Sequence, residues 1–380
     1  MKKILVWIIV ILSSLLILIY AFNVEYLLKG VRTIYLTGNN TAFISDHEYF
    51  ENREIKTSVP QPWVLHKKYN SITQSENLKK INEERKTKSF LVIKNDSIVF
   101  EKYFDNHQPS ILSNSFSVTK SIVTSMMFKA IMEGKIKGLD QPVSDYFEEY
   151  KDGLASELTV GDLASMSSGM KWSEKYYSVI NITSESYFTD ELRSVILRQD
   201  IIDKPGQSFR YSSGDTQLLG MVIEKATGTT LTNYLSEKFW KPMGAEYSAL
   251  WQIDSEESGM EKAYCCIAST ARDFARFGKL YINKGRWNDE IILDPSYIDL
   301  SINPVFKDSP FYGYGWWLYD YEGKKVFTMN GHRGQFVISF PDENIIIVRQ
   351  GEDNNEGGND GPSDLFQYIS EGYKIATSIE

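Results

Sequence analysis

The sequence predicts an α/β fold in which strands from both ends of the chain form one sheet and a helical subdomain lies between them. Strand-like runs gather before residue 104 and again after residue 312. The stretch between residues 115 and 241 instead carries apolar residues at helical spacing. Strands at both ends with helices between them favour a single sheet completed by the C-terminal segment.

The first strands form a predicted hairpin, in which the β-rich runs 90–93 and 98–100 flank a polar Asn95-Asp96 turn. An apolar helix follows over residues 121–132 and ends at Gly134. The acidic stretch 351–361, rich in Gly and Asn, is expected to be a loop. Further helices are expected at 160–166, 190–198, 216–227, 270–283 and 364–377, and further strands at 312–319, 325–329, 336–340 and 345–350.

The N-terminus carries an uncharged apolar run over residues 4–22, preceded by Lys2 and Lys3. This length matches the ~17–25 residues of a membrane-spanning helix, so we expect contact with the lipid bilayer through residues 4–22. A cleaved signal peptide is the alternative, but no small residue lies two before Ala21. The lysines favour a cytoplasmic N-terminus, which predicts a single-pass cell-membrane protein with an extracytoplasmic globular part.

Composition excludes several functional classes. The net charge is −9 and no basic run occurs, so nucleic acid is not an expected partner. The two cysteines, Cys265 and Cys266, are adjacent, and neighbouring residues rarely satisfy disulfide geometry. No Cys/His spacing suits zinc and the four histidines are scattered, so neither a metal nor a cofactor is expected. The sequence does not predict an oligomeric state.

Ser117 and Lys120 form the strongest chemical motif. Ser117 lies at the start of the predicted helix, and Lys120 follows one turn later on the same face. Free N–H groups at a helix start favour a developing oxyanion, and burial there would lower the pKa of the lysine so that it can accept the serine proton. A helix-capping serine with a surface lysine is the alternative. A second match at Ser168 and Lys171 lies in a loop-like cluster without a following helix.

Three further segments accompany this motif: residues 158–169, residues 205–220 and the turn 331–335. Together with Ser117-Val118-Thr119-Lys120, they resemble the serine β-lactamase and penicillin-binding-protein superfamily. More narrowly, they resemble the class C β-lactamase-related serine hydrolases, and most closely the branch of family VIII esterases and aminohexanoate-oligomer hydrolases. The resemblance covers about residues 63–375. It implies a β-lactamase/transpeptidase-like fold with an antiparallel sheet and helices on both faces.

The apolar run and the segment after it predict a membrane anchor (1–24) and a tether (25–62) before a serine hydrolase domain (63–380). The resemblance also implies residue roles. Ser117 would be the nucleophile, Lys120 its partner and Tyr211 the proton relay. Backbone N–H groups of Ser117 and Gln335 would form the oxyanion hole. The implied substrate-binding residues are Gln335, Gly334, His332, Ser213 and, on weaker similarity, Tyr176.

This chain departs from the lactamase pattern at three positions. Ser213, His332 and Arg333 stand where lactamases usually carry Asn, Lys and Thr. The departures weaken the grip on a β-lactam carboxylate and favour hydrolysis of small-molecule esters or amides through an acyl-enzyme. A non-catalytic, membrane-tethered binding or cell-wall-recognition module is the alternative, because a fold does not guarantee activity. No Gly-x-Ser-x-Gly occurs, which argues against a Ser-His-Asp hydrolase.

Overall fold

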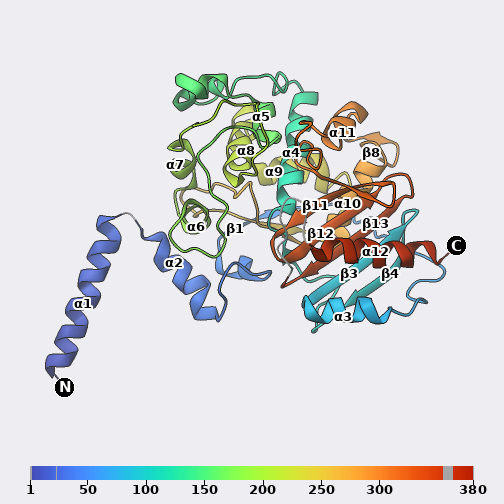
Figure 1. Cartoon of the computed structure of the whole chain (residues 1–380), viewed down its shortest axis with the longest axis horizontal. Coiled ribbons are helices and arrows are strands. Elements are labelled where there is room, and N and C mark those ends of the chain that lie inside the picture. The colour runs from blue at the N-terminus through green and yellow to red at the C-terminus, as the bar shows by residue number, and fades with distance from the viewer. Residues whose placement is uncertain (1, 23, 354–362, 380) are drawn as a thin grey trace.

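A seven-stranded sheet forms the centre of the fold and combines strands from both ends of the chain (Figure 1). The computed structural model describes residues 2–22, 24–353 and 363–379, and its strand order is β10-β11-β12-β13-β3-β4-β2. Antiparallel pairing of β13 with β3 joins the C-terminal strands to the N-terminal hairpin, whereas the short β2 pairs with β4 in parallel. The strands are β2 (Val64–Leu65), β3 (Thr87–Lys94), β4 (Ser97–Tyr103), β10 (Trp317–Tyr321), β11 (Lys324–Gly331), β12 (Gln335–Phe340) and β13 (Ile345–Gly351).

Helices cover both faces of this sheet. On one face lie α3 (Glu76–Glu84) and α12 (Ser363–Thr377), and on the other lie α4 (Val118–Met132) and α10 (Ala271–Ile282). Along β12, Phe336 and Ile338 belong to the core that α12 covers, and Val337 belongs to the opposite core. Successive strand residues point to opposite faces, so continuous burial of β12 follows from the two helical layers.

The inserted helical part packs on the side of α4 that faces away from the sheet. Because α4 contacts both α8 and β11, it is enclosed between the two halves of the molecule, and nearly all of its side chains are buried. The remaining elements are α5 (Val160–Ala164), α6 (Ile182–Phe188), α7 (Leu192–Leu197), α8 (Ser213–Thr227), α9 (Leu231–Leu235), α11 (Pro295–Ser301) and the pair β8 (Arg286–Trp287) and β9 (Glu290–Ile291).

A second sheet ties the N-terminal segment to the domain. Its order is β1-β6-β7-β5, formed by β1 (Asn52–Ile55), β6 (Ala249–Gln252), β7 (Ile267–Ser269) and β5 (Ser113–Asn114). In addition, α2 (Tyr26–Thr33) packs against α6. Residues 25–62 therefore include ordered elements that pack on the domain, although the predicted domain boundaries stay a prediction.

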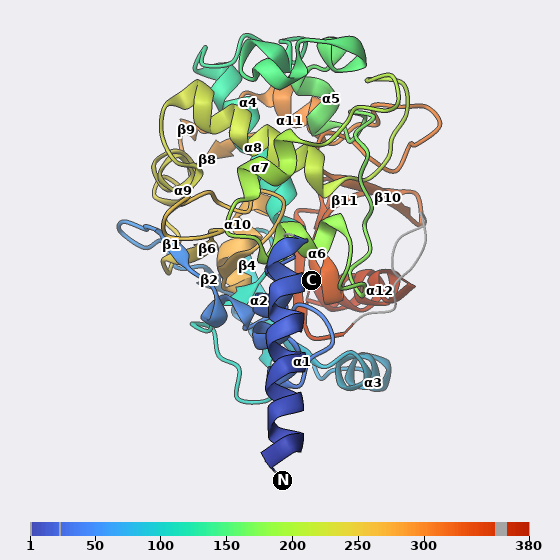
Figure 2. The same cartoon turned by 90° about the vertical axis from the view of Figure 1, so that its left-hand side faces the viewer.

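Most predicted elements are confirmed: the 90–100 hairpin is β3–β4, the helix after Ser117 is α4, and the expected C-terminal strands are β10 to β13. The loop expected at 351–361 lies largely outside the described residues. Helix α1 (Lys2–Ala21) extends away from the domain in Figures 1 and 2. Across residues 2–22, 24–353 and 363–379, no helix combines the length and apolarity needed to cross a membrane, so the anchor expected at 4–22 is not supported.

Candidate active site

Ser117 lies where β5 ends and α4 begins. The residue before it, Phe116, has a φ of 49°, a left-handed conformation that non-glycine residues adopt rarely. The Asn114 side chain stabilises this turn by accepting the Phe116 N–H (3.0 Å). Ser117 makes no side-chain capping hydrogen bond, so its hydroxyl is directed elsewhere. The capping alternative therefore does not describe this serine.

Lys120 reaches Ser117 from one helical turn further on. Its Nζ donates to Ser117 Oγ (2.9 Å) and to the Tyr264 carbonyl oxygen (2.8 Å). Only 2% of Lys120 is exposed, and this burial lowers the pKa of Lys120 from 10.5 to about 8. The negative charge of Glu174 acts in the opposite direction. A lysine with this pKa can hold a neutral amine near neutral pH and accept a proton.

Tyr211 borders the same space from the loop before α8. Lys120 Nζ lies 5.1 Å from the centre of the Tyr211 ring, and the centre of the Trp317 ring lies 5.6 Å from the same ring centre. Burial, reinforced by the charge of Glu174, raises the pKa of the Tyr211 phenol, and a hydrogen bond with Ser117 opposes this effect. The phenol is therefore neutral and has a proton to give.

Glu174 is a site residue that sequence reasoning did not select. Ser213, at the start of α8, donates its backbone N–H to Glu174 Oε1 and its hydroxyl to Glu174 Oε2 (3.2 Å). The carboxylate is close enough to shift the pKa values of Lys120 and Tyr211. Its one sequence signal was its position two residues before Tyr176, in a loop already linked to substrate contact.

The turn 332–334 joins β11 to β12 and lies next to the Ser117 segment. A Cβ on Gly331 would lie 2.2 Å from the Ser115 carbonyl oxygen, so this close approach requires glycine. Buried Arg349 supports the turn, because its Nη1 donates to the carbonyl oxygens of Arg333 (2.6 Å) and Gly334 (2.8 Å). These bonds fix the backbone immediately before Gln335.

The residues expected at this turn do not all face the same space. His332 lies among aromatic rings, 5.1 Å from Tyr176 and 5.5 Å from Phe116 between ring centres. Burial, followed by the charge of Arg333, lowers the pKa of His332 to about 3, so the imidazole is neutral. The Gln335 side chain is buried and donates to the Gly351 carbonyl oxygen (2.6 Å), so it is engaged within the protein.

The second Ser/Lys match does not form a comparable pair. Ser168 is buried and donates its hydroxyl to Asp215 Oδ1 (2.7 Å), whereas Lys171 is exposed. Asp215 also receives the Ser168 N–H, and burial raises the pKa of this carboxyl to about 7. Ser117 thus has a lysine amine within hydrogen-bonding distance, whereas the hydroxyl of Ser168 bonds to a carboxylate.

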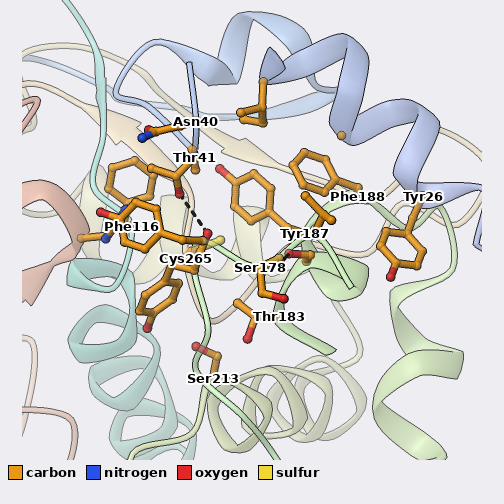
Figure 3. A pocket seen from close by; sticks show the side chains of 18 of the residues that line it. Tyr26, Asn40, Thr41, Phe116, Ser178, Thr183, Tyr187, Phe188, Ser213 and Cys265 are labelled. Carbon is orange, nitrogen blue, oxygen red and sulfur yellow. Dashed lines mark hydrogen bonds between the residues drawn. The ribbon is translucent and has the colours of Figure 1, made fainter. Parts of the chain in front are cut away.

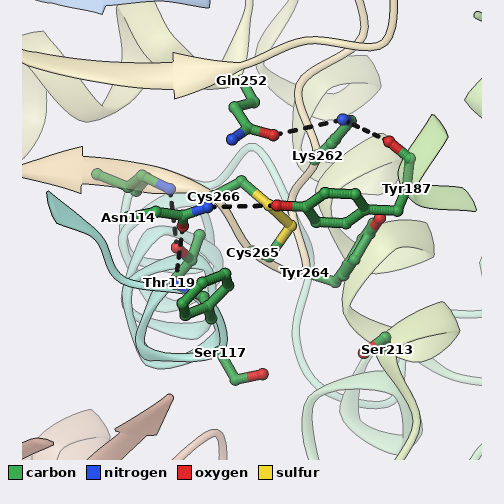
Figure 4. The surroundings of a disulfide bond; sticks show 12 residues. Asn114, Ser117, Thr119, Tyr187, Ser213, Gln252, Lys262, Tyr264, Cys265 and Cys266 are labelled. Atoms are coloured by element: carbon green, nitrogen blue, oxygen red, sulfur yellow. Dashed lines mark hydrogen bonds between the residues drawn. A yellow bond between two sulfur atoms is a disulfide. The ribbon is translucent and has the colours of Figure 1, made fainter. Parts of the chain in front are cut away.

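Cys265 and Cys266 form a disulfide (Figure 4), so the expectation that these neighbours would not pair is wrong. Cys266 has a φ of 78°, and this left-handed conformation turns the backbone sharply between the two residues. The preceding carbonyl, that of Tyr264, is the one that accepts the Lys120 hydrogen bond. The disulfide thus directly follows, in the sequence, the residue whose carbonyl oxygen binds Lys120.

A cavity of about 360 Å³ opens beside Ser117 and Ser213 (Figure 3). Ser117, Ser213, Tyr176 and His332 line it, whereas Gly334 and Gln335 do not. The opposite wall comes from α2, α6 and residues 40–42. Within the described residues, no cluster of His, Cys, Asp or Glu side chains is suited to a metal ion.

Comparison with known proteins adds independent information. A protein-family model described as Beta-lactamase matches residues 76–360. The 6-aminohexanoate-dimer hydrolase of Paenarthrobacter ureafaciens is 26% identical over 293 residues, which cover 70% of this chain and 73% of that protein. Beta-lactamase-like protein 2 of Dictyostelium discoideum is 27% identical over 292 residues, 66% of this chain, but the match covers only 51% of that protein.

Solved structures agree on the fold. A Bacillus anthracis protein, provisionally named a 6-aminohexanoate-dimer hydrolase, superposes with a TM-score of 0.75 at 22% identity and covers 89% of this chain and 93% of its own. A class C beta-lactamase superposes with a TM-score of 0.58 at 17% identity, covering 80% and 95%. The α/β arrangement predicted from the sequence is thus the β-lactamase/transpeptidase-like fold.

Proposed function

The chain belongs to the Beta-lactamase family of serine hydrolases, and from this premise we propose that it cleaves small ester or amide bonds through an acyl-enzyme on Ser117. The hydrogen bond between Lys120 Nζ and Ser117 Oγ (2.9 Å) carries the proposal, because it joins a nucleophile to a buried amine whose pKa is about 8.

Acylation begins when the neutral Lys120 amine takes the proton of Ser117 and Oγ attacks the substrate carbonyl carbon. The carbonyl oxygen becomes an oxyanion, which the N–H groups of Ser117 and Gln335 stabilise. The neutral phenol of Tyr211 gives its proton to the departing alkoxide or amine and regains one from protonated Lys120. The products of this step are the Ser117 ester and the free alcohol or amine.

Deacylation uses the same groups in reverse. Lys120 and Tyr211 together remove a proton from water, and the resulting hydroxide attacks the acyl carbon. The ester bond to Ser117 breaks, its oxygen regains a proton, and the carboxylic acid leaves. Glu174 fixes Ser213 at the edge of this space and adjusts the pKa of Lys120, so we assign it a positioning role.

The charge at the turn supports esters and amides over β-lactam antibiotics as substrates. His332 occupies the position where lactamases usually carry Lys, and its imidazole is neutral. Arg333 directs its Nη1 to the Glu352 carbonyl oxygen (2.8 Å). A carboxylate on the substrate therefore gains little cationic stabilisation from either side chain.

Intact-mass detection of an acyl adduct tests the proposed function. The protein is incubated with a panel of esters, amides and β-lactams and with a fluorophosphonate probe. We expect adducts with the first two classes and with the probe, and Ser117→Ala should abolish all of them while the fold is retained. Adducts or hydrolysis that persist in Ser117→Ala would disprove the nucleophile. An unlabelled, inactive native protein would instead favour a binding module.

The extracytoplasmic, membrane-bound location stays a prediction from the sequence. Fractionation of cells that produce the full chain tests it, because an anchored protein sediments with membranes and resists extraction by high salt. Recovery of the full-length chain in the soluble fraction would contradict the prediction.

A further inference from the structure

The wall of the cavity that faces Ser117 comes from the N-terminal segment. Residues 26–42 contribute α2 and the following loop to the lining, and α6 completes this wall. This segment precedes residues 76–360, the part that the family model matches. The lining residues from these elements include Gly30, Val31, Ile34 and Thr41 of the N-terminal segment and Phe188 of α6.

Specific contacts hold this wall in place. A Cβ on Gly30 would lie 3.3 Å from the Phe188 ring, so α2 and α6 are in close contact. Lys29 Nζ bonds to Asp190 (2.6 Å) and to a main-chain carbonyl oxygen (2.9 Å) at one end of the contact. At the other end, Thr41 Oγ1 donates to the Tyr176 carbonyl oxygen (3.2 Å). The N-terminal segment is thus attached to both the helical part and the site loop.

The chemistry of the lining selects for an uncharged ligand. None of the described lining residues is Asp, Glu, Lys or Arg, and His332 is neutral. Aromatic and aliphatic side chains make up most of the surface, which includes Val31 and Ile34 of α2. Burial of a charged or zwitterionic group against such a surface is unfavourable, whereas burial of CH₂ groups is favourable.

We propose that this cavity binds an apolar alkyl chain of the substrate, so that the enzyme prefers esters or amides carrying such a chain over acetyl-sized ones. The inference rests on the proposed function, because Ser117 supplies the reacting end of the same cavity. A volume of about 360 Å³ lies within the usual range of small-molecule sites. The α2 side chains act as the specificity-determining wall.

Two substrate series measure this preference and locate the chain. In the first, p-nitrophenyl esters run from acetate to dodecanoate; in the second, acetate esters run from ethyl to dodecyl. Each buried CH₂ should raise kcat/KM by about two- to fourfold in one series, until the chain fills the cavity. A rise in the first series puts the chain on the acyl side, and a rise in the second puts it on the alcohol side.

A variant pair tests the wall itself. Val31 lines the cavity, whereas Leu28, on the same helix and similarly exposed, does not. We expect Val31→Trp to lower the ratio of long-chain to acetyl kcat/KM by at least about tenfold, and Leu28→Trp to leave it unchanged. The same pair is made in Ser117→Ala, and binding of decyl acetate is followed by tryptophan fluorescence. Val31→Trp should weaken this binding and Leu28→Trp should not.

The outcomes separate the two proposals. If kcat/KM does not change with chain length in either series, the alkyl-chain inference is overturned. Fluorophosphonate labelling and acetyl ester hydrolysis in the same experiment would leave the hydrolase function standing. Equal effects of Val31→Trp and Leu28→Trp on decyl acetate binding, or no binding at all, would also overturn it. Loss of labelling and of all turnover, with selective decyl acetate binding retained, would remove the hydrolase function and keep the alkyl-chain site.

Discussion

The pKa of Lys120 predicts a steep pH dependence of acylation. If the neutral amine is the base, kcat/KM follows the neutral fraction of Lys120, whose pKa is about 8. That fraction is ~9% at pH 7 and ~91% at pH 9, so kcat/KM should rise about tenfold between these two values. The assay is hydrolysis of p-nitrophenyl acetate, followed at the isosbestic wavelength of nitrophenol and corrected for uncatalysed hydrolysis.

Glu174→Gln tests whether the rise of kcat/KM with pH reports the deprotonation of Lys120. The negative charge of Glu174 raises the pKa of Lys120 against the effect of burial, so its removal should shift the midpoint to lower pH and raise kcat/KM at pH 7. Glutamine keeps an oxygen that can accept the Ser213 N–H. Glu256→Gln, an exposed carboxylate outside the site, is the matched control and should leave the profile unchanged.

Asp215 could be confused with Lys120, because its pKa is raised to about 7 by burial. Asp215→Asn should therefore leave the limb near pH 8 in place, even if it lowers the plateau. A profile that is flat between about pH 6 and about pH 9, or a midpoint that moves upward in Glu174→Gln, would refute the assignment of Lys120 as the base.

Three further predictions follow from other contacts. Burial lowers the pKa of Lys120 from 10.5 to about 8, so the charged lysine destabilises the fold at pH 7, and this destabilisation fades as the pH approaches 10.5. Lys120→Met should therefore be more stable than the native protein at pH 7. This difference in unfolding free energy, measured by urea unfolding, should shrink by about 2 kcal/mol between pH 7 and pH 10. Arg349→Met removes the donor from two turn carbonyls and should lower the unfolding free energy by about 3 kcal/mol and reduce kcat more than it raises KM; unchanged stability and kcat would contradict this. Reduction of the Cys265–Cys266 disulfide should lower activity about tenfold, because it frees the backbone next to Tyr264, and a Cys265→Ser/Cys266→Ser double variant should be insensitive to reductant.

Sequence patterns predicted the parts of the site that depend on local geometry. Residues three apart on a helix share a face, so Ser117 and Lys120 could be paired before the fold was known. The β-rich runs of β3 and β4 and the apolar length of α4 likewise follow from neighbouring residues. The predicted residues Ser213, Tyr176 and His332 line one cavity with Ser117, although their roles stay proposals.

The features that sequence reasoning missed depend on contacts between distant segments. Glu174 and Ser213 are 39 residues apart, and nothing in either local pattern shows that they meet. The pairing of the adjacent residues Cys265 and Cys266 is a local exception, and the left-handed backbone of Cys266 was not predicted from the sequence either. The ordered packing of α2 on α6 was missed because α2 has only eight residues, too few for a helix to be predicted from its pattern alone.

The position of α2 has an evolutionary consequence. The groups proposed for bond cleavage lie within residues 76–360, whereas α2 lies before them. Mutations in the leading segment can therefore retune which molecules are accepted without altering the reaction centre, and the two traits can diverge at different rates. A chimaera that takes only residues 76–360 from a relative would inherit the donor's reacting groups and α6 but keep the recipient's α2 wall of the proposed alkyl-chain site.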